Sequence, residues 1–473
     1  MTKLMTKLLL ASTLALFCSA YAQAQGPNAS SSLNYYWVSF TDKTGTPYSI
    51  DAPEAFLSPR AIQKRERLNI EVTAADFPPN PAYLEGLKAQ GARVHHRSRW
   101  LNAATVACDS ATAAALLALD YVQTVNYVGK YSGQKGPGVK PLKGMAKLGS
   151  EIKPDEYYGY GAQQIKLING DSLHQMGFDG SGVLVAVLDG GFTGVDQSPF
   201  FDSLRANEQL LPAVDIVDMD DVAWESSSHG TKVLSCMGAN RPGLLVGTAP
   251  GATYICIKTE ETRSETLTEE CHWVAGIEYA DSLGADVVNS SLGYTQFDEN
   301  EMNYTLTDLN GRKSVASQAA DIAASKGMLV VTSAGNEGSS AWRGLGVPAD
   351  AAGALSIGAT TLDGRRASFS SYGPTADRRI KPDVSAPGAW VTLADARNYQ
   401  VTMGSGTSFA SPITAGMVAC LRQAFPTASV EEIYDAVRNS SSQADVPDAS
   451  IGYGIPDFVK AYHLLKEADK PRP

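Results

Sequence analysis

The sequence predicts a three-layer α/β fold with a mostly parallel central sheet, preceded by a small α+β module. Beyond about Tyr160, short and continuous apolar runs alternate with helical segments, a pattern typical of parallel strands covered by helices on both faces. Before residue 130, strand and helix signals alternate on a smaller scale. The chain has 473 residues, of which 44% are hydrophobic and 19% charged, so it can bury a large core.

The first residues have the order of a cleavable export signal. Two lysines precede the apolar stretch Leu8–Phe17, and the small residues of Ala20–Ala24 follow. We expect residues 1–24 to be a signal peptide, cut after Ala24 or two residues earlier, and the mature protein to be periplasmic or extracellular. A lipid anchor on Cys18 is the alternative, but the bulky residue before this cysteine fits such a signal poorly. No later stretch is long and apolar enough to predict a membrane span.

Charge and cysteine content argue against several classes of protein. The formal net charge is −11, so nucleic acid is not an expected partner, because phosphate binding depends on basic clusters. The cysteines that follow the signal are too few and scattered for a disulfide-built scaffold, although one or two bridges stay open. We favour Cys236 and Cys420 as buried apolar residues within helices. No Cys-x-x-Cys pair indicates zinc.

Residues 33–130 are predicted to form the small α+β domain, and residues 131–160 an exposed linker. The expected strands are Tyr36–Phe40, Ala103–Ala107 and Val122–Val128, and the expected helices are near Ser58–Leu68, Tyr83–Ala89 and Ser110–Leu119. The linker is rich in Gly, Lys and Pro and has no sustained hydrophobic period.

Residues 161–468 are predicted to form the larger α/β domain. Its clearest strands are Val183–Leu188, Tyr254–Ile257, Asp286–Asn289, Met328–Val331 and Leu355–Ile357. Its helices are expected at Glu269–Leu283, Ser314–Lys326 and Val430–Arg438, the last opened by a capping box from Ser429 and Glu432. In open α/β sheets, the functional residues gather at the carboxyl ends of the strands.

Three polar residues lie where functional groups are expected in such a fold, at the end of a strand or at the start of a helix. Asp189 ends an apolar strand and is followed by two glycines, whereas His229 precedes an apolar-periodic helix. Ser408 follows a glycine-rich approach and opens a helix, where free amides and the helix dipole favour negative charge. Taken singly, each residue has an ordinary structural interpretation, as a turn former, a structural histidine or an N-cap serine.

Taken together, these segments resemble the subtilisin family of serine proteases (peptidase S8). The family's Asp, His and Ser blocks occur here in the same chain order, and Thr332–Asn336 resembles the segment that carries the family's oxyanion-stabilising Asn. Two other segments, Gly247–Ala252 and Lys381–Gly388, match further recurrent stretches, so the resemblance covers roughly residues 170–454. Several blocks in the right order make chance a poor explanation.

The resemblance implies a subtilisin-like fold and a secreted serine endopeptidase. Ser408 would attack the peptide carbonyl, His229 would transfer protons, and Asp189 would orient the imidazole. Asn336 would stabilise the oxyanion together with the backbone N–H of Ser408. The implied substrate-binding residues are Ser291, Leu292, Gly293, Ala334 and Gly335. One departure is Gly190, which stands where the family usually has a small hydroxyl residue, so a supporting hydrogen bond is in doubt.

By position and strand-helix pattern, the leading module resembles the propeptide of such proteases, with a ferredoxin-like fold. It would act as an intramolecular inhibitor until the linker is cut, and the alternative is a permanent accessory domain. The expected partners are protein or peptide substrates, and the expected oligomeric state is a monomer. No cofactor is required, and a structural calcium ion is an open expectation from the family.

Further residues invite other interpretations. The acidic segment Asp215–Asp221 lacks the spacing of an EF-hand loop, so a solvated turn is favoured over calcium binding. Adjacent His95 and His96 would point to opposite faces of a strand, which disfavours a shared metal. Trp342 and Tyr372 either line the substrate groove or simply pack against neighbouring residues.

Two rival functions stay open at the level of the sequence. An α/β-hydrolase esterase would use Ser408 with a later acidic residue and His463, although its nucleophile turn requires Gly where the chain has Ala410. A non-catalytic binding protein on the same fold is the second rival, because a fold alone does not imply function.

Overall fold

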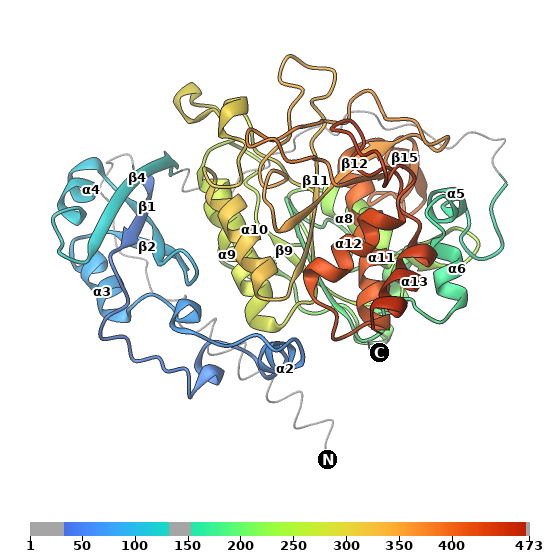
Figure 1. The fold of residues 1–473 in the computed structure, drawn as a ribbon. Helices are drawn as coiled ribbons and strands as arrows, with labels where there is room; N and C mark the ends of the chain where they lie inside the picture. The colour runs from blue at the N-terminus through green and yellow to red at the C-terminus, as the bar shows by residue number, and fades with distance from the viewer. Residues whose placement is uncertain (1–32, 132–152, 470–473) are drawn as a thin grey trace. The chain divides into compact units, whose positions relative to one another are not determined.

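A computed structural model describes residues 33–131 and 153–469 (Figure 1). The predicted signal peptide, residues 1–24, and most of the predicted linker lie outside the described residues. The chain divides into two compact units, named here the N-terminal unit, Met1–Ile62 with Val72–Gln134, and the large unit, Gln63–Glu71 with Lys135–Pro473.

The N-terminal unit contains a four-stranded antiparallel sheet. Its strand order is β2-β3-β1-β4, with β1 Asn34–Phe40, β2 Arg93–Ser98, β3 Ala103–Cys108 and β4 Val122–Lys130. The helices of the leading region are α2 Pro59–Arg67, whose last turns belong to the large unit, α3 Pro81–Ala89 and α4 Ser110–Leu116. A strand-helix-strand-strand-helix-strand chain with this strand order is ferredoxin-like, which confirms the predicted α+β class.

The core of the N-terminal unit is built from alternate residues of its strands. Val38, Val106 and Leu116 are fully buried within one cluster, to which α3 contributes Leu87. The strand β2 was missed in the sequence, because its residues Arg93–Ser98 include two histidines and two arginines rather than an apolar alternation. β2 is nevertheless a strand, because it pairs with β3 in antiparallel fashion.

The large unit is built around a seven-stranded sheet in which every pairing between neighbouring strands is parallel. The order across the sheet is β13 Val384–Pro387, β12 Ala354–Thr360, β11 Leu329–Ser333, β10 Val287–Ser290, β5 Leu184–Asp189, β9 Thr253–Lys258 and β6 Val214–Asp215. Five of these strands were predicted from continuous apolar runs, and all five are confirmed to within a few residues. The predicted α/β class with a mostly parallel sheet is therefore confirmed.

Helices cover both faces of this sheet (Figure 1). One face carries α9 Thr268–Leu283 and α10 Val315–Ser325, whereas the other carries α8 His229–Gly238 and α11 Thr407–Ala424. Two further helices, α12 Val430–Ser440 and α13 Phe458–Ala468, pack against each other, and the predicted capping box of Ser429 and Glu432 opens α12. The shorter elements are α5 Ala162–Lys166, α6 Gly170–Gln175, α7 Asp202–Ala206, the pair β7 Asn240–Arg241 and β8 Leu245–Val246, and the pair β14 Val391–Ala394 and β15 Val401–Gly404.

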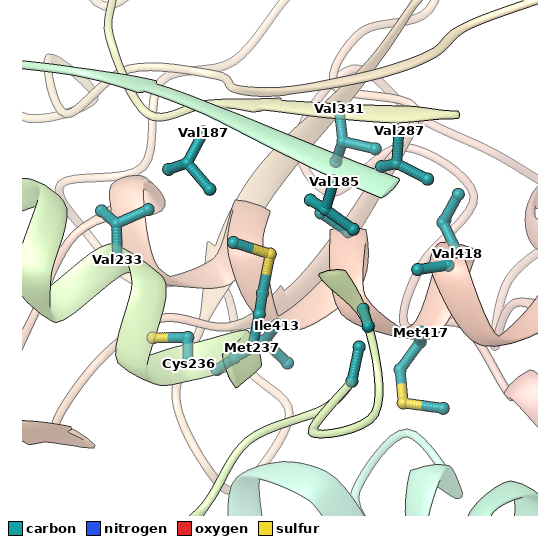
Figure 2. Packing of buried hydrophobic residues seen from close by; sticks show 14 of the residues in the cluster. Val185, Val187, Val233, Cys236, Met237, Val287, Val331, Ile413, Met417 and Val418 are labelled. Atoms are coloured by element: carbon teal, nitrogen blue, oxygen red, sulfur yellow. The ribbon is translucent and has the colours of Figure 1, made fainter. Parts of the chain in front are cut away.

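The alternation of side chains along β5 explains why this strand reads as a continuous apolar run. Val185 and Val187 point toward α8 and α11, where they meet Val233 and Ile413 (Figure 2). On the opposite face, Leu188 lies beside α9. Because both faces are covered, every residue of the strand is buried, and apolar side chains occupy both.

No helix in the described part of the chain is long and apolar enough to cross a membrane. Cys236 in α8 and Cys420 in α11 are buried free thiols, as predicted, and burial raises the pKa of the Cys236 thiol. These thiols are therefore small apolar residues of the core.

A buried carboxylate ties β13 to the helical layer. Asp383 lies between two cations: Lys381 Nζ is 2.6 Å from Oδ2, and Arg438 Nε is 3.0 Å from Oδ1. The backbone N–H of Ser356 also donates to Oδ2 at 2.7 Å. Burial alone would raise the pKa of Asp383, but the charges of Lys381 and Arg438 outweigh it and hold this pKa below its usual value.

Asp383→Asn should lower the free energy of unfolding by about 3–5 kcal/mol, because it leaves the buried Lys381 ammonium without its anion and removes one of the two carboxylates that pair with Arg438. Urea unfolding of the Ser408→Ala chain, followed by tryptophan fluorescence, measures the loss. The matched control is Asp435→Asn, whose exposed carboxylate also pairs with Arg438 and should cost less than about 1 kcal/mol. The Asp383 contribution is present above the unfolded pKa near 3.8 and should disappear as the pH falls through the lower folded pKa. Equal losses in the two variants would contradict this assignment.

Candidate active site

A buried carboxylate and an imidazole meet at the carboxyl end of β5. Asp189 is the last residue of β5 and is fully buried, while His229 is the first residue of α8. The Nδ1 atom of His229 lies 2.9 Å from each carboxylate oxygen of Asp189. A proton on Nδ1 therefore donates to Asp189 and leaves Nε2 of the neutral ring as an acceptor.

The surroundings of His229 favour its charged form. Burial lowers the pKa of His229, but the charge and hydrogen bond of Asp189, followed by the charge of Glu260, raise it more. Lys232, one turn further along α8, acts in the opposite direction. The net result is a pKa above the usual value of 6.5.

Ser408 is the second residue of α11, at the predicted helix start. Its Oγ donates to the carbonyl of Ser291 at 3.2 Å, and the Ser291 hydroxyl donates back to the Ser408 carbonyl at 2.8 Å. The adjacent Phe409 ring lies 5.9 Å from the His229 ring, measured between centroids. The start of α11 and the imidazole are thus neighbours.

Asn336 is held at the same helix start by its amide oxygen. Thr407 donates to Asn336 Oδ1 twice, from its backbone N–H at 2.9 Å and from its hydroxyl at 3.0 Å. The Thr407 hydroxyl also accepts from the Gly335 N–H at 3.2 Å. Since Oδ1 is engaged in this way, the exposed amide group of Asn336 presents its NH2 as the remaining donor.

The predicted substrate-binding segments follow two adjacent strands. Ser291, Leu292 and Gly293 come directly after β10, and Ala334 and Gly335 come directly after β11. A hydrogen bond from the Ser333 hydroxyl to the Leu292 carbonyl, 3.5 Å long, connects the two segments. The first segment also contacts the nucleophile candidate through Ser291. The structure therefore gathers all these residues at one edge of the sheet.

Sequence reasoning missed Glu260, which lies beside the Asp189–His229 pair. A Cβ atom placed on Gly190 would lie 3.0 Å from Oε2 of Glu260. Glu260 follows β9, the strand next to β5, and Thr259 donates from its backbone to the Asp189 carbonyl at 3.0 Å. The signal was available, because Glu260 follows an apolar strand in the same way that Asp189 ends one.

The backbone of Gly190 replaces the hydrogen bond that a hydroxyl side chain at this position would give to Asp189. Its backbone N–H donates to Asp189 Oδ1 at 2.8 Å, so the carboxylate is held without a neighbouring hydroxyl side chain. The next residue, Gly191, has a φ of +140°, and a Cβ there would lie 2.2 Å from the Glu225 carbonyl oxygen. Glycine at 191 is therefore required by the close approach of the backbone.

The structure also describes the surroundings of other candidate residues. The acidic segment Asp215–Asp221 is partly buried: Asp215 pairs with Lys258 at 2.6 Å and Asp218 pairs with it at 3.1 Å, so the prediction of a solvated turn is wrong for Asp215. Trp342 donates to the Leu345 carbonyl at 3.1 Å, a local contact. His463, the base required by the esterase alternative, is exposed on α13.

A carboxylate, an imidazole and a serine near the carboxyl edge of a parallel sheet are the groups expected of a subtilisin-like serine hydrolase. Residues 180–454 match the model of the Subtilase family, which is more than half of the chain, and the chain belongs to this family. Residues 35–140 match the Peptidase S8 propeptide domain of Bacteroidota. The predicted family, the propeptide and the enzyme class of serine endopeptidase are confirmed, and the α/β-hydrolase alternative loses its support.

Curated relatives agree with the family match. Subtilisin NAT of Bacillus subtilis subsp. natto is 33% identical over 60% of this chain and 66% of its own length. The thermostable alkaline protease of Halalkalibacterium halodurans is 29% identical over 66% of this chain and 75% of its own length. Subtilisin DY of Bacillus licheniformis is 30% identical over 61% of this chain and 93% of its own length.

Glu260→Gln should lower the pKa of His229, because it removes a negative charge that stabilises the imidazolium. NMR titration of the histidine ring protons in the Ser408→Ala chain measures this shift. The control is Glu261→Gln, the same change one residue further on, where the carboxylate pairs with Arg263. A His229 pKa that falls equally in both variants, or in neither, would contradict a specific effect of Glu260.

Proposed function

We propose that this chain is a secreted serine endopeptidase that hydrolyses peptide bonds through an acyl-enzyme on Ser408. The observation that carries the proposal is the buried Asp189 carboxylate, 2.9 Å from His229 Nδ1, beside the helix start that bears Ser408. Membership of the subtilase family supports it. The same membership supports export, together with the signal-like sequence of residues 1–24.

In the first chemical step, Ser408 Oγ attacks the carbonyl carbon of the scissile bond. His229 Nε2 takes the hydroxyl proton, and Asp189 stabilises the imidazolium through its bond to Nδ1. The carbonyl π electrons move to oxygen, and the Asn336 NH2 and the Ser408 N–H donate to this oxyanion. When the tetrahedral intermediate collapses, the C–N bond breaks and His229 protonates the leaving amine.

The second half of the reaction releases the acyl group. Water attacks the ester carbon while His229 Nε2 accepts its proton, and collapse of this intermediate returns the proton to Ser408 Oγ. The peptide itself would lie along Ser291–Gly293 and Ala334–Gly335, at the ends of adjacent strands. This placement brings its carbonyl between Ser408 and Asn336.

The N-terminal unit would be the enzyme's own inhibitor. The propeptide match over residues 35–140 supports an intramolecular inhibitor, with the domain limits 33–130, 131–160 and 161–468 as proposed boundaries. Its removal would require a cut within residues 131–160, which the catalytic site of the same chain can make. The mature enzyme would act as a monomer on protein or peptide substrates and would need no organic cofactor for the chemistry.

Ser408→Ala should abolish proteolysis and leave the chain at its full length after signal removal, because the acyl-enzyme cannot form. Mass spectrometry of purified protein and proteome-wide mapping of cleavage sites, with wild type beside the variant, measure both effects. A variant that is trimmed like the wild type would rule out self-processing. Wild-type protein that neither cleaves unfolded protein nor reacts with a serine-directed phosphonate would favour a non-catalytic binding protein.

Asn336→Ala should lower kcat by about 10²–10³ with little change in KM, the loss that removing one oxyanion donor causes in the family's sites. Steady-state kinetics on a peptide substrate measure it. Asn336→Asp is the companion variant, because it keeps the acceptor that Thr407 contacts but has no NH2 donor. Recovery of activity in Asn336→Asp would show that the residue acts only by holding Thr407.

A further inference from the structure

A short segment of the leading region folds with the large unit rather than with the N-terminal unit. Residues 35–140 match the propeptide model, yet Gln63–Glu71, inside this range, belongs to the large unit. We call residues 63–71 the anchor segment; it contains the end of α2 and the turn that follows this helix. The propeptide sequence is therefore not one self-contained body, because its middle is part of the unit that carries Asp189, His229 and Ser408.

Two cations of the anchor segment are buried against one carboxylate of α9. Lys64 and Arg65 are each only 1% exposed, and such residues are almost never fully buried unless they are paired. Arg65 Nη2 donates to Oδ2 of the buried Asp281 at 2.8 Å, and Lys64 Nζ lies 3.4 Å from its Oδ1. Each cation also donates to a backbone carbonyl, Lys64 to Ala285 at 2.8 Å and Arg65 to Lys326 at 3.0 Å. These contacts fix the segment in one orientation.

A third ion pair connects the anchor segment to the start of two strands. Arg67, which is more exposed, donates to Asp286 Oδ1 at 2.7 Å. Oδ2 of the same carboxylate accepts the backbone N–H of Leu184, the first residue of β5, at 3.1 Å. The last turns of α2 are thus basic, in a chain whose net charge is −11, and the surface that they contact is acidic. The two sides are complementary in charge.

Leu68 and Ile70 add an apolar contact beside these charges. A Cβ atom placed on Gly327, between α10 and β11, would lie 2.4 Å from Leu68 Cδ1 and 2.9 Å from Ile70 Cδ1. Glycine at this position therefore leaves room for the two side chains. Glu66 and Asn69, on the other side of the segment, are exposed. The segment consequently has one face that fits the rest of the large unit and one face in solvent.

The anchor segment contacts the amino edge of the parallel sheet. Asp286 comes directly before β10, and Gly327 comes shortly before β11. Ser291 and Asn336 follow the same two strands at their carboxyl ends. Because the strands run in one direction, the partners of the anchor segment and the candidate catalytic groups lie at opposite edges of the sheet.

We propose that this amino edge is a second binding surface for the propeptide, with the anchor segment as its ligand, and that it holds the propeptide on the enzyme after the linker is cut. The inference rests on the proposed function, in which a cut within residues 131–160 separates the propeptide from the catalytic domain. A contact at the opposite edge of the sheet does not use the substrate groove. Binding of the propeptide and inhibition by it are therefore separable.

A chain that cannot cut itself tests the anchor segment. Ser408→Ala, with a recognition site for an added protease within residues 131–160 and a C-terminal affinity tag, is cut after folding, and release of the N-terminal fragment from the tagged part is timed. Adding Arg65→Met should speed this release about 30-fold or more, because one partner of a buried charge pair is lost. Lys88→Met is the charge-matched control. It removes an exposed lysine of the N-terminal unit that pairs with Glu85, and should not change the rate.

Two further variants separate the anchor from a general loss of stability. Leu68→Ala removes the contact with Gly327 without changing the charge, and should also speed release. Asp281→Asn combined with Arg65→Met should accelerate release by less than the product of the two single effects, because both changes remove the same interaction. Circular dichroism of the uncut chains checks that each variant is folded, and Leu68→Ala decides where Arg65→Met does not fold.

An excess of unfolded casein, a general protease substrate that competes for the groove, should leave the release rate unchanged. Acceleration by casein to the rate of Arg65→Met would overturn the proposal, since the groove would then hold the fragment. Equal release from folded Arg65→Met, Leu68→Ala and the parent chain would also overturn it, as would loss of the parent fragment at the moment of cutting. Failure of the wild-type chain to process itself counts against the proposed function alone, because the added protease makes the cut in this experiment.

Discussion

The inner strands of the large unit are covered by helices on both faces, and this burial limits where polar chemistry can occur. Along β5 every residue up to Leu188 is apolar and buried, and the first carboxylate appears at Asp189, where the strand ends. The same limit applies to β9, β10 and β11, which are followed by Glu260, Ser291 and Asn336. Because parallel strands end at one edge, these groups converge without any local sequence pattern that connects them.

Much of this arrangement is predictable from the sequence, since a doubly covered strand reads as a continuous apolar run. The strands from β5 to β12 that exceed three residues fall in this category, and so does the helix start at Ser408. β13 and β6 were not predicted. The first, Val384–Pro387, includes serine and proline, and the second has only two residues, so neither has an apolar run; both are strands because a neighbour pairs with them.

The site was predicted where a motif exists and missed where only tertiary structure brings residues together. Asp189, His229 and Ser408 each lie in a recognisable block, and the structure places the first two in direct contact. Glu260 has no such block. It follows β9, and the pairing of β9 with β5 brings it close to Asp189.

Gly190 shows how one small residue adjusts the electrostatics of this edge. A Cβ atom here would lie 3.0 Å from the Glu260 carboxylate, so glycine leaves room for a second negative charge close to the Asp189–His229 pair. Its backbone N–H meanwhile supplies Asp189 with a hydrogen bond that needs no side chain. The cost is an imidazole whose pKa is raised by two carboxylates, which removes the neutral base as the pH falls.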